Sequence, residues 1–162
     1  MNARKAGKSI LLTYHEYASN ELLQPADREL VKAAHDAALR AYAPYSKFHV
    51  GAALRLSDGT IVTGNNQENA SYPAGICAER TAVFSAMSQH PQGVVKEMAV
   101  VVPQVEGDRP VSPCGICRQA LLEQEHRQRS PIRMLLGATK GPVIELDSVK
   151  ALLPLSFDAS FL

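Results

Sequence analysis

All three cysteines of the chain fall in two short motifs, and thiolates at these spacings could hold a metal ion. Cys114 and Cys117 are three residues apart, so one helical turn would put both side chains on the same face, at a spacing suited to one tetrahedral zinc. Cys77 is the remaining thiol that could provide a third ligand. Because the chain has no fourth cysteine, we expect water in the fourth position, which is the arrangement of a catalytic zinc site.

Glu79 and Arg80 closely follow the first cysteine and extend its motif. Residues two apart inside a helix point to different faces, so Cys77 and Glu79 can share a site only if they straddle the start of a helix. The same reasoning applies to Cys114, which follows a proline. Helix N-termini would favour the thiolate form of both cysteines. We expect the Arg80 guanidinium to donate hydrogen bonds to the sulfurs and so offset the negative charge of three thiolates around one Zn²⁺.

Other interpretations of these motifs stay open. A Cys-x-x-Cys pair can be a redox couple, and a histidine could complete a structural zinc site instead of water. Glu79 alone would be an ordinary first-turn acid of a helix, and Arg80 an ordinary surface charge. Their positions beside Cys77 favour roles at the metal. The histidines that could act as a fourth ligand are His15, His35, His49, His90 and His126.

Length, composition and charge narrow the function classes. The 162 residues fit a single domain, and 46% hydrophobic with 20% charged residues is an ordinary globular composition. The net charge is +1 with dispersed basic residues, which argues against a nucleic acid polymer as partner. The apolar run at residues 10–12 is shorter than a signal-peptide core, and we expect no membrane partner. The odd number of cysteines favours a reducing, cytoplasmic compartment.

Helix and strand patterns alternate along the chain and define the elements that must position the motifs. Apolar residues at helical spacing follow residue 25, with Asp27 expected to cap the helix, and this helix should end before Pro44. Alternating apolar residues from Phe48 predict the first strand of a hairpin that turns at residues 57–59. The order predicts an α/β domain over residues 25–162 with a central sheet of about five strands, preceded by an arm over residues 1–24. Further helices are expected at about 77–89, 114–126 and 148–153, and strands at 98–102, 132–136 and 143–146.

Both cysteine motifs resemble those of the homotetrameric, zinc-dependent cytidine deaminases. They read Cys77-Ala78-Glu79-Arg80-Thr81-Ala82 and Pro113-Cys114-Gly115-Ile116-Cys117-Arg118-Gln119. Blocks at residues 43–54 and 63–72 also agree, although Gln67 stands where the family often has an aliphatic residue, and the likeness covers about residues 25–157. The resemblance implies a three-layer α/β/α domain with a mixed sheet and one Zn²⁺ per subunit. It also implies hydrolysis of cytidine and deoxycytidine to uridine and deoxyuridine in pyrimidine salvage, by a zinc-activated hydroxide.

Roles at the substrate follow from the same resemblance. Glu79 would be the catalytic proton shuttle, and the Ala78 amide and the segment around Ser112 would contact the polar edge of the base. Phe48 would pack on the base, whereas Asn66 and Glu68 would bind the ribose hydroxyls of a small-molecule nucleoside. Alternatively, Phe48 is plain strand core, and the Asn66 and Glu68 side chains merely satisfy backbone groups of a turn.

Assembly and substrate choice are the last expectations. Tyr72 and Phe157 resemble elements that reach a neighbouring subunit's site, which implies a homotetramer with shared active sites. Phe161 competes with Phe157 for that role. Related zinc deaminases act on blasticidin S, guanine or cytosines in nucleic acid, and the same scaffold could be an inactive zinc-binding module. The pair Asn66-x-Glu68 and the intact Glu79 favour an enzyme acting on free cytidine.

Overall fold

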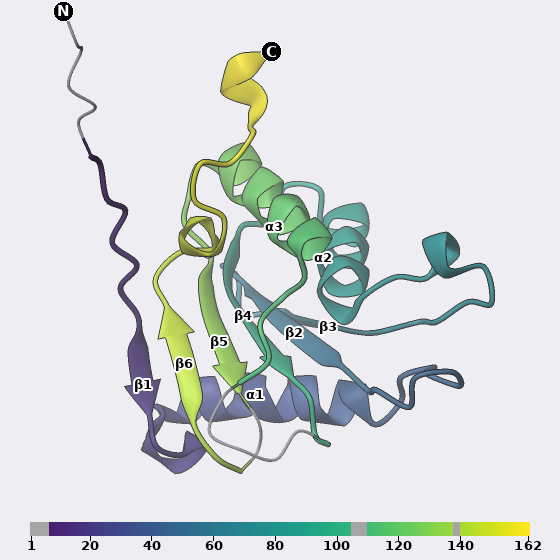
Figure 1. Ribbon diagram of the computed structural model, residues 1–162. Helices are drawn as coiled ribbons and strands as arrows, with labels where there is room; N and C mark the ends of the chain where they lie inside the picture. Colours follow the sequence, from purple (N-terminus) through teal and green to yellow (C-terminus); the bar gives the residue numbers. More distant parts are fainter. Residues whose placement is uncertain (1–6, 105–109, 138–139) are drawn as a thin grey trace, which may run out of the picture.

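Six strands and three α-helices form the part of the protein that the structure describes (Figure 1). The computed structural model describes residues 7–104, 110–137 and 140–162. The strands are β1 (His15–Tyr17), β2 (Gly51–Leu56), β3 (Ile61–Asn65), β4 (Val95–Val101), β5 (Arg133–Gly137) and β6 (Val143–Leu146). The helices are α1 (Pro25–Ala38), α2 (Ala78–Gln89) and α3 (Gly115–Gln128), with short 3-10 turns η1 (Asn20–Leu22), η2 (Tyr72–Ala74), η3 (Val149–Leu152) and η4 (Ala159–Phe161).

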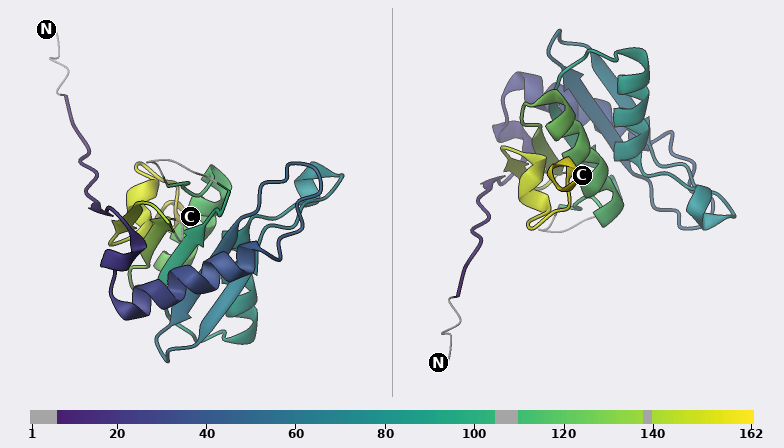
Figure 2. Two further views of the ribbon diagram at one scale, coloured as in Figure 1. Left: turned by 90° about the horizontal axis from the view of Figure 1, so that it is seen from below. Right: turned by 90° about the horizontal axis from the view of Figure 1, so that it is seen from above.

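The strands make one mixed sheet in the order β1-β6-β5-β4-β2-β3. Neighbouring strands are antiparallel except for the parallel pair β4 and β5. Helix α1 covers one face of the sheet, and α2 and α3 lie side by side on the other (Figures 1 and 2). The three-layer α/β/α arrangement expected from the sequence is therefore confirmed.

The sheet has one strand more than the expected five or so. The additional strand is β1, which pairs antiparallel with β6 at residues assigned by sequence to the arm. Tyr17 strengthens this pairing because its hydroxyl donates a hydrogen bond of 2.7 Å to Glu145 on β6. Residues 10–14 line a cavity together with residues 150–156, and the arm extends beyond the body toward residue 7 (Figures 1 and 2); residues 1–6 of the arm lie outside the described residues.

The expectation that Asp27 caps α1 is wrong. Gln24 is the N-cap residue, and Asp27 lies inside the first turn with 6% of its surface exposed. Its carboxylate accepts two hydrogen bonds, of 2.8 and 2.6 Å, from the Arg133 guanidinium on β5. A bidentate, charge-assisted pair of this kind is stronger than a cap bond to backbone amides, so the aspartate pins the helix to the sheet instead.

Two layers of apolar side chains hold the helices on the sheet. Leu30, Val31 and Ala34 of α1 pack against one face, and the α2 and α3 side chains pack against the other. Helix α2 lies especially close to β3 because Gly64 has no side chain. A Cβ at this position would lie 2.4 Å from the Ala82 nitrogen and 2.6 Å from the Ala78 carbonyl oxygen. No helix in the described ranges has the length and apolar character needed to cross a membrane.

Candidate metal centre and active site

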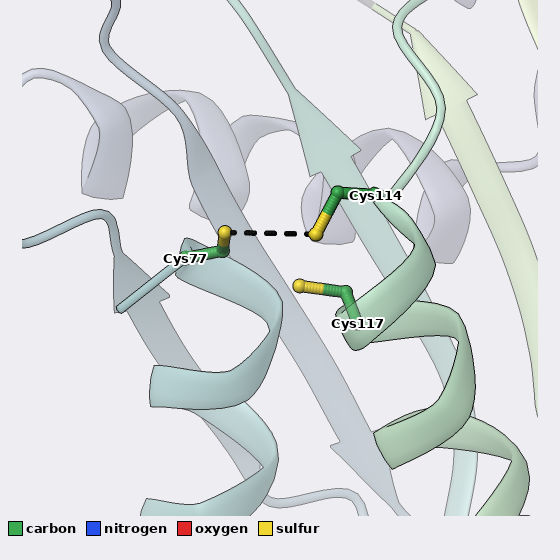
Figure 3. A group of neighbouring side chains, drawn as sticks. All are labelled: Cys77, Cys114 and Cys117. Carbon is green, nitrogen blue, oxygen red and sulfur yellow. Dashed lines mark hydrogen bonds between the residues drawn. The ribbon is translucent and has the colours of Figure 1, made fainter. Parts of the chain in front are cut away.

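The three cysteine sulfurs meet where two helices begin (Figure 3). Cys77 is the N-cap residue of α2, Cys114 is the N-cap residue of α3, and Cys117 follows in the first turn of α3. The Sγ atoms of Cys77 and Cys114 are 3.9 Å apart, and all three Sγ atoms lie within 4.8 Å of one another. Tetrahedral zinc with bonds of about 2.3 Å would place its sulfur ligands about 3.8 Å apart. The residues present therefore fit a zinc ion.

Arg80 supplies positive charge to this cluster from the first turn of α2. Its Nη2 atom lies 3.9 Å from the Cys77 sulfur, and its Nε atom is buried without a hydrogen-bond acceptor among the described residues. Burial lowers the pKa of the guanidinium, but hydrogen bonds with Cys77 and Cys117 outweigh it and raise the pKa, so the side chain stays charged. The expected charge compensation is thus geometrically available.

The thiols themselves share protons. A hydrogen bond from the Cys117 thiol lowers the pKa of Cys77, with Arg80 and Cys114 contributing in the same direction. That contact raises the pKa of Cys117, and its burial adds to the effect. The two shifts thus have one main cause, the hydrogen bond between these sulfurs, and a zinc ion held here would require both cysteines as thiolates.

Glu79 is the buried carboxyl group of the site. It is the second residue of α2 and only 4% exposed. Burial raises its pKa, and the negative charge of Cys77 raises it further, whereas hydrogen bonding with Cys117 acts in the opposite direction. A carboxyl group with a raised pKa beside a metal-binding cluster is suited to general acid and base catalysis. Ala78, fully buried, precedes it as the first residue of α2, so its N–H has no acceptor within the helix.

Asn66 and Glu68 follow β3 and hold the loop that leads into β2. The Asn66 amide accepts a hydrogen bond of 2.8 Å from the Val50 nitrogen and donates one of 2.8 Å to the Phe48 carbonyl oxygen. Glu68 accepts bonds from the backbone nitrogen of Tyr45, at 2.9 Å, and from the hydroxyl of Ser46. The hydrogen bond from Ser46 lowers the pKa of Glu68. Both side chains therefore satisfy backbone groups, as the alternative interpretation expected, and each keeps further hydrogen-bonding capacity for a ligand.

A cavity of about 570 Å³ joins several predicted residues to the metal cluster. Asn66, Glu68, Tyr72, Cys77 and Arg80 line it together. Ser46 and Tyr45 also line it. Neither was predicted as a site residue, although both lie in the block at residues 43–54 that carries the family resemblance, and this block was the signal that could have identified them.

Three aromatic side chains predicted for the site are exposed in the single chain. Phe48 is not among the cavity's lining residues, is 40% exposed, and is tied to the site only through its backbone. Tyr72, in η2, is 78% exposed and packs edge-on against Tyr45, with ring centroids 6.4 Å apart. Phe157 is 60% exposed and stacks on Phe161 at 5.7 Å. Phe157 is not among the residues that line the cavity.

Histidine does not join the ligand set. In the part of the chain that the structure describes, the three cysteines are the one group of three or more side chains placed to hold a metal ion. This geometry favours an open coordination position over a structural site closed by histidine.

Comparisons with known proteins agree with this geometry. The family model described as the cytidine and deoxycytidylate deaminase zinc-binding region matches residues 24–130. A cytidine deaminase of Halalkalibacterium halodurans is 45% identical over 134 residues, which are 82% of this chain and 96% of that protein. A blasticidin-S deaminase of Bacillus cereus is 30% identical over 81% of this chain and 91% of its own length. The crystal structure of a cytidine deaminase from Burkholderia pseudomallei superposes with a TM-score of 0.71 at 42% identity, covering 80% of this chain and 97% of that one.

Proposed function

Because the chain belongs to the cytidine and deoxycytidylate deaminase family, we propose that it hydrolyses the exocyclic amine of cytidine and deoxycytidine, giving uridine or deoxyuridine and ammonia. The observation that carries this proposal is the buried Glu79 beside three converging cysteine sulfurs. Sequence identity of 45% over most of both chains supports the nucleoside as substrate. Pyrimidine salvage is the metabolic role that this reaction serves.

Cys77, Cys114 and Cys117 would hold one zinc ion per subunit. Zinc, when bound, supplies a Lewis acid that makes water acidic enough to act as a nucleophile near neutral pH. The N-termini of α2 and α3 and the charge of Arg80 stabilise the thiolate ligands. These groups together offset the negative charge of the three thiolates, which would otherwise make zinc a weaker Lewis acid.

Glu79 moves the protons of the reaction. Its carboxylate takes a proton from the attacking water and delivers it to ring N3 as the oxygen–C4 bond forms. It then carries the second proton to the exocyclic nitrogen, so that the C4–N bond breaks and ammonia leaves. Burial keeps this carboxyl group away from competing water and raises its affinity for the proton that it must carry between the two steps.

Substrate binding is assigned to Asn66 and Glu68, which line the cavity, and to Ala78 and Phe48, which lie close to its lining residues in the chain. The Ala78 N–H is proposed to contact the base, Phe48 to pack on it, and Asn66 and Glu68 to bind the ribose hydroxyls. Glu68 is ionised, and Arg80 is committed to the sulfurs, so the lining residues that the structure describes present no free cation for a 5′-phosphate. A nucleoside therefore fits the lining better than a nucleotide.

We further propose a homotetramer with shared active sites. Tyr72 and Phe157 are largely exposed aromatic side chains, and the segment around η2 projects from the body (Figure 1). Such residues gain stability by packing on another copy of the chain. A cytoplasmic, reducing compartment remains the prediction from the three free thiols. Light scattering on the purified protein tests the assembly state.

The activity test compares substrates and one matched pair of variants. Cytidine and deoxycytidine should lose their cytosine absorbance rapidly, whereas free cytosine should react poorly. Glu79→Gln should retain zinc and lose about 10²–10⁴-fold in kcat, because the substitution removes the proton carrier but little volume. Glu123→Gln, on the exposed face of α3, is the control and should keep full activity.

Blasticidin S is the second candidate substrate, because the Bacillus cereus enzyme matches most of this chain. Faster turnover of blasticidin S than of cytidine would replace the first proposal. Inertness toward both, with zinc bound, would mean a zinc-binding module without catalysis.

A further inference from the structure

Arg118 follows the last cysteine of the cluster and connects three separate backbone or side-chain acceptors. Its Nε atom donates to the Pro113 carbonyl oxygen at 2.8 Å, and its Nη2 atom donates to the Ser112 hydroxyl at 3.0 Å. Its Nη1 atom donates to the Leu152 carbonyl oxygen at 3.0 Å. Every guanidinium nitrogen of this partly buried side chain thus has an acceptor.

The acceptors belong to two segments with different positions in the chain. Ser112 and Pro113 immediately precede the ligand Cys114, whereas Leu152 ends η3 and begins the C-terminal segment. The neighbouring side chain acts on the same segment, because Gln119 donates a hydrogen bond of 3.1 Å to the Phe157 carbonyl oxygen. Two successive residues of α3 therefore fasten the C-terminal segment to the helix that carries two of the three sulfurs.

We propose that Arg118 is a positioning residue that fixes the approach of the 112–114 loop to the metal cluster and couples it to the C-terminal segment. Cys114 is an exposed N-cap residue, and among the described residues its side chain makes no hydrogen bond outside the sulfur cluster. Its place is consequently set by the backbone before it, which Arg118 holds through Pro113. Lysine could not perform this function, because its single ammonium group on a flexible chain lacks the rigid fork of donors with which the guanidinium binds three acceptors.

The test measures zinc release as well as activity. Holding groups behind metal ligands typically change metal affinity or activity by about 10–100-fold, so Arg118→Lys should release zinc to a chromophoric chelator at least about ten-fold faster than the unaltered protein. Arg127→Lys is the matched control on the same helix, because Arg127 donates to the Pro91 carbonyl oxygen far from the sulfurs. Both variants are compared below their melting temperatures, with circular dichroism as the check on folding.

A purely structural role would lower thermal stability in Arg118→Lys and leave zinc release within about two-fold of Arg127→Lys, which would overturn the proposal. If Arg118→Lys does not fold, Ser112→Ala removes one acceptor alone and should still accelerate release, and an unchanged rate would likewise overturn it. In the double variant that combines Arg118→Lys with Ser112→Ala, the second change should not accelerate zinc release further, because both changes break the contact between these two side chains.

The kinetic part of the inference rests on the proposed deaminase function. With cytidine, Arg118→Lys should lower kcat more than it raises KM, since the displaced ligand acts on the chemical step. If the unaltered protein binds zinc but does not deaminate cytidine, the proposed function fails while the zinc-release comparison still decides the role of Arg118.

Discussion

Adding a single methyl group at Gly64 should disturb the metal centre from the opposite side of α2. Gly64 lies on β3 beneath the first turns of this helix, and Ala78 and Ala82 are the residues that its missing side chain would meet. Ala78 lies between Cys77 and Glu79 in sequence. Displacement of α2 at this point therefore moves a metal ligand and the proposed proton carrier together.

The size of the effect follows from the contacts. The new Cβ would lie 2.4 Å from the Ala82 nitrogen and 2.6 Å from the Ala78 carbonyl oxygen, whereas ordinary contacts begin at 3.4 Å. Helix backbone cannot rotate away as a side chain can, so α2 must shift by roughly 1 Å. Overpacking of this kind costs about 1–3 kcal/mol of folding free energy, and a misplacement of about 1 Å at a catalytic group can cost about 10²-fold in rate.

Steady-state deamination of cytidine, zinc content and urea unfolding should be measured together for Gly64→Ala. We expect kcat/KM to fall by about 10²-fold and the free energy of unfolding to fall by about 1–3 kcal/mol. Gly7→Ala is the control, because a Cβ there meets nothing within 4 Å. Full activity and unchanged stability in Gly64→Ala would refute the argument that this close approach sets the position of α2.

Three further predictions concern charge and the edge of the sheet. Since burial raises the pKa of Glu79 and catalysis needs its carboxylate, kcat/KM should decline on the acid side at a pH above about 4.3, the ordinary glutamate value; a decline centred at or below it would contradict this environment. Arg133→Met leaves the buried Asp27 without its ion-pair partner, whereas Glu97 keeps Arg55 and Glu145 keeps the Tyr17 hydroxyl, and it should cost about 3 kcal/mol in urea unfolding, the low end for a broken buried pair because Arg133 is 27% exposed; Lys32→Met at an exposed pair should leave the midpoint unchanged. Tyr17→Phe should cost about 0.5–1 kcal/mol by losing the hydroxyl bond to β6, with Tyr14→Phe as the control, and equal stability of the two variants would show that this bond does not hold β1.

Periodicity predicted most of the fold because the helices and central strands bury continuous apolar stripes. The helix expected at about 77–89 is α2, and the strand expected at 143–146 is β6. The three residues of β1 show no such pattern, because an alternation over only three residues cannot be distinguished from a loop. The strand exists because the edge of β6 offers unpaired backbone groups and Glu145 accepts the Tyr17 hydroxyl. Both contacts join residues more than a hundred positions apart.

The ligand set was predictable for a different reason. Thiolates are few, and their spacing on a helical turn restricts which of them can meet, so Cys114 and Cys117 identify the centre before any fold is known. Asp27 shows where this kind of reasoning fails. An acidic residue at the start of a helix suggests an N-cap. Only the register of β5 in the sheet shows that the Asp27 carboxylate binds the Arg133 guanidinium instead.

Residues without catalytic chemistry explain how two separate helices bring three cysteine sulfurs within 4.8 Å of one another. The start of α2 is set from below by Gly64, whose missing side chain lets the helix lie on β3. The start of α3 is set from behind by Arg118, which holds the loop before Cys114. Neither residue binds the metal ion or transfers a proton in the reaction. Neither the spacing of residues nor the composition of the sequence marks these two positions as important. Conservative substitutions of Gly64 and Arg118 should therefore impair zinc retention or turnover more than substitutions that remove exposed charges from α2 and α3.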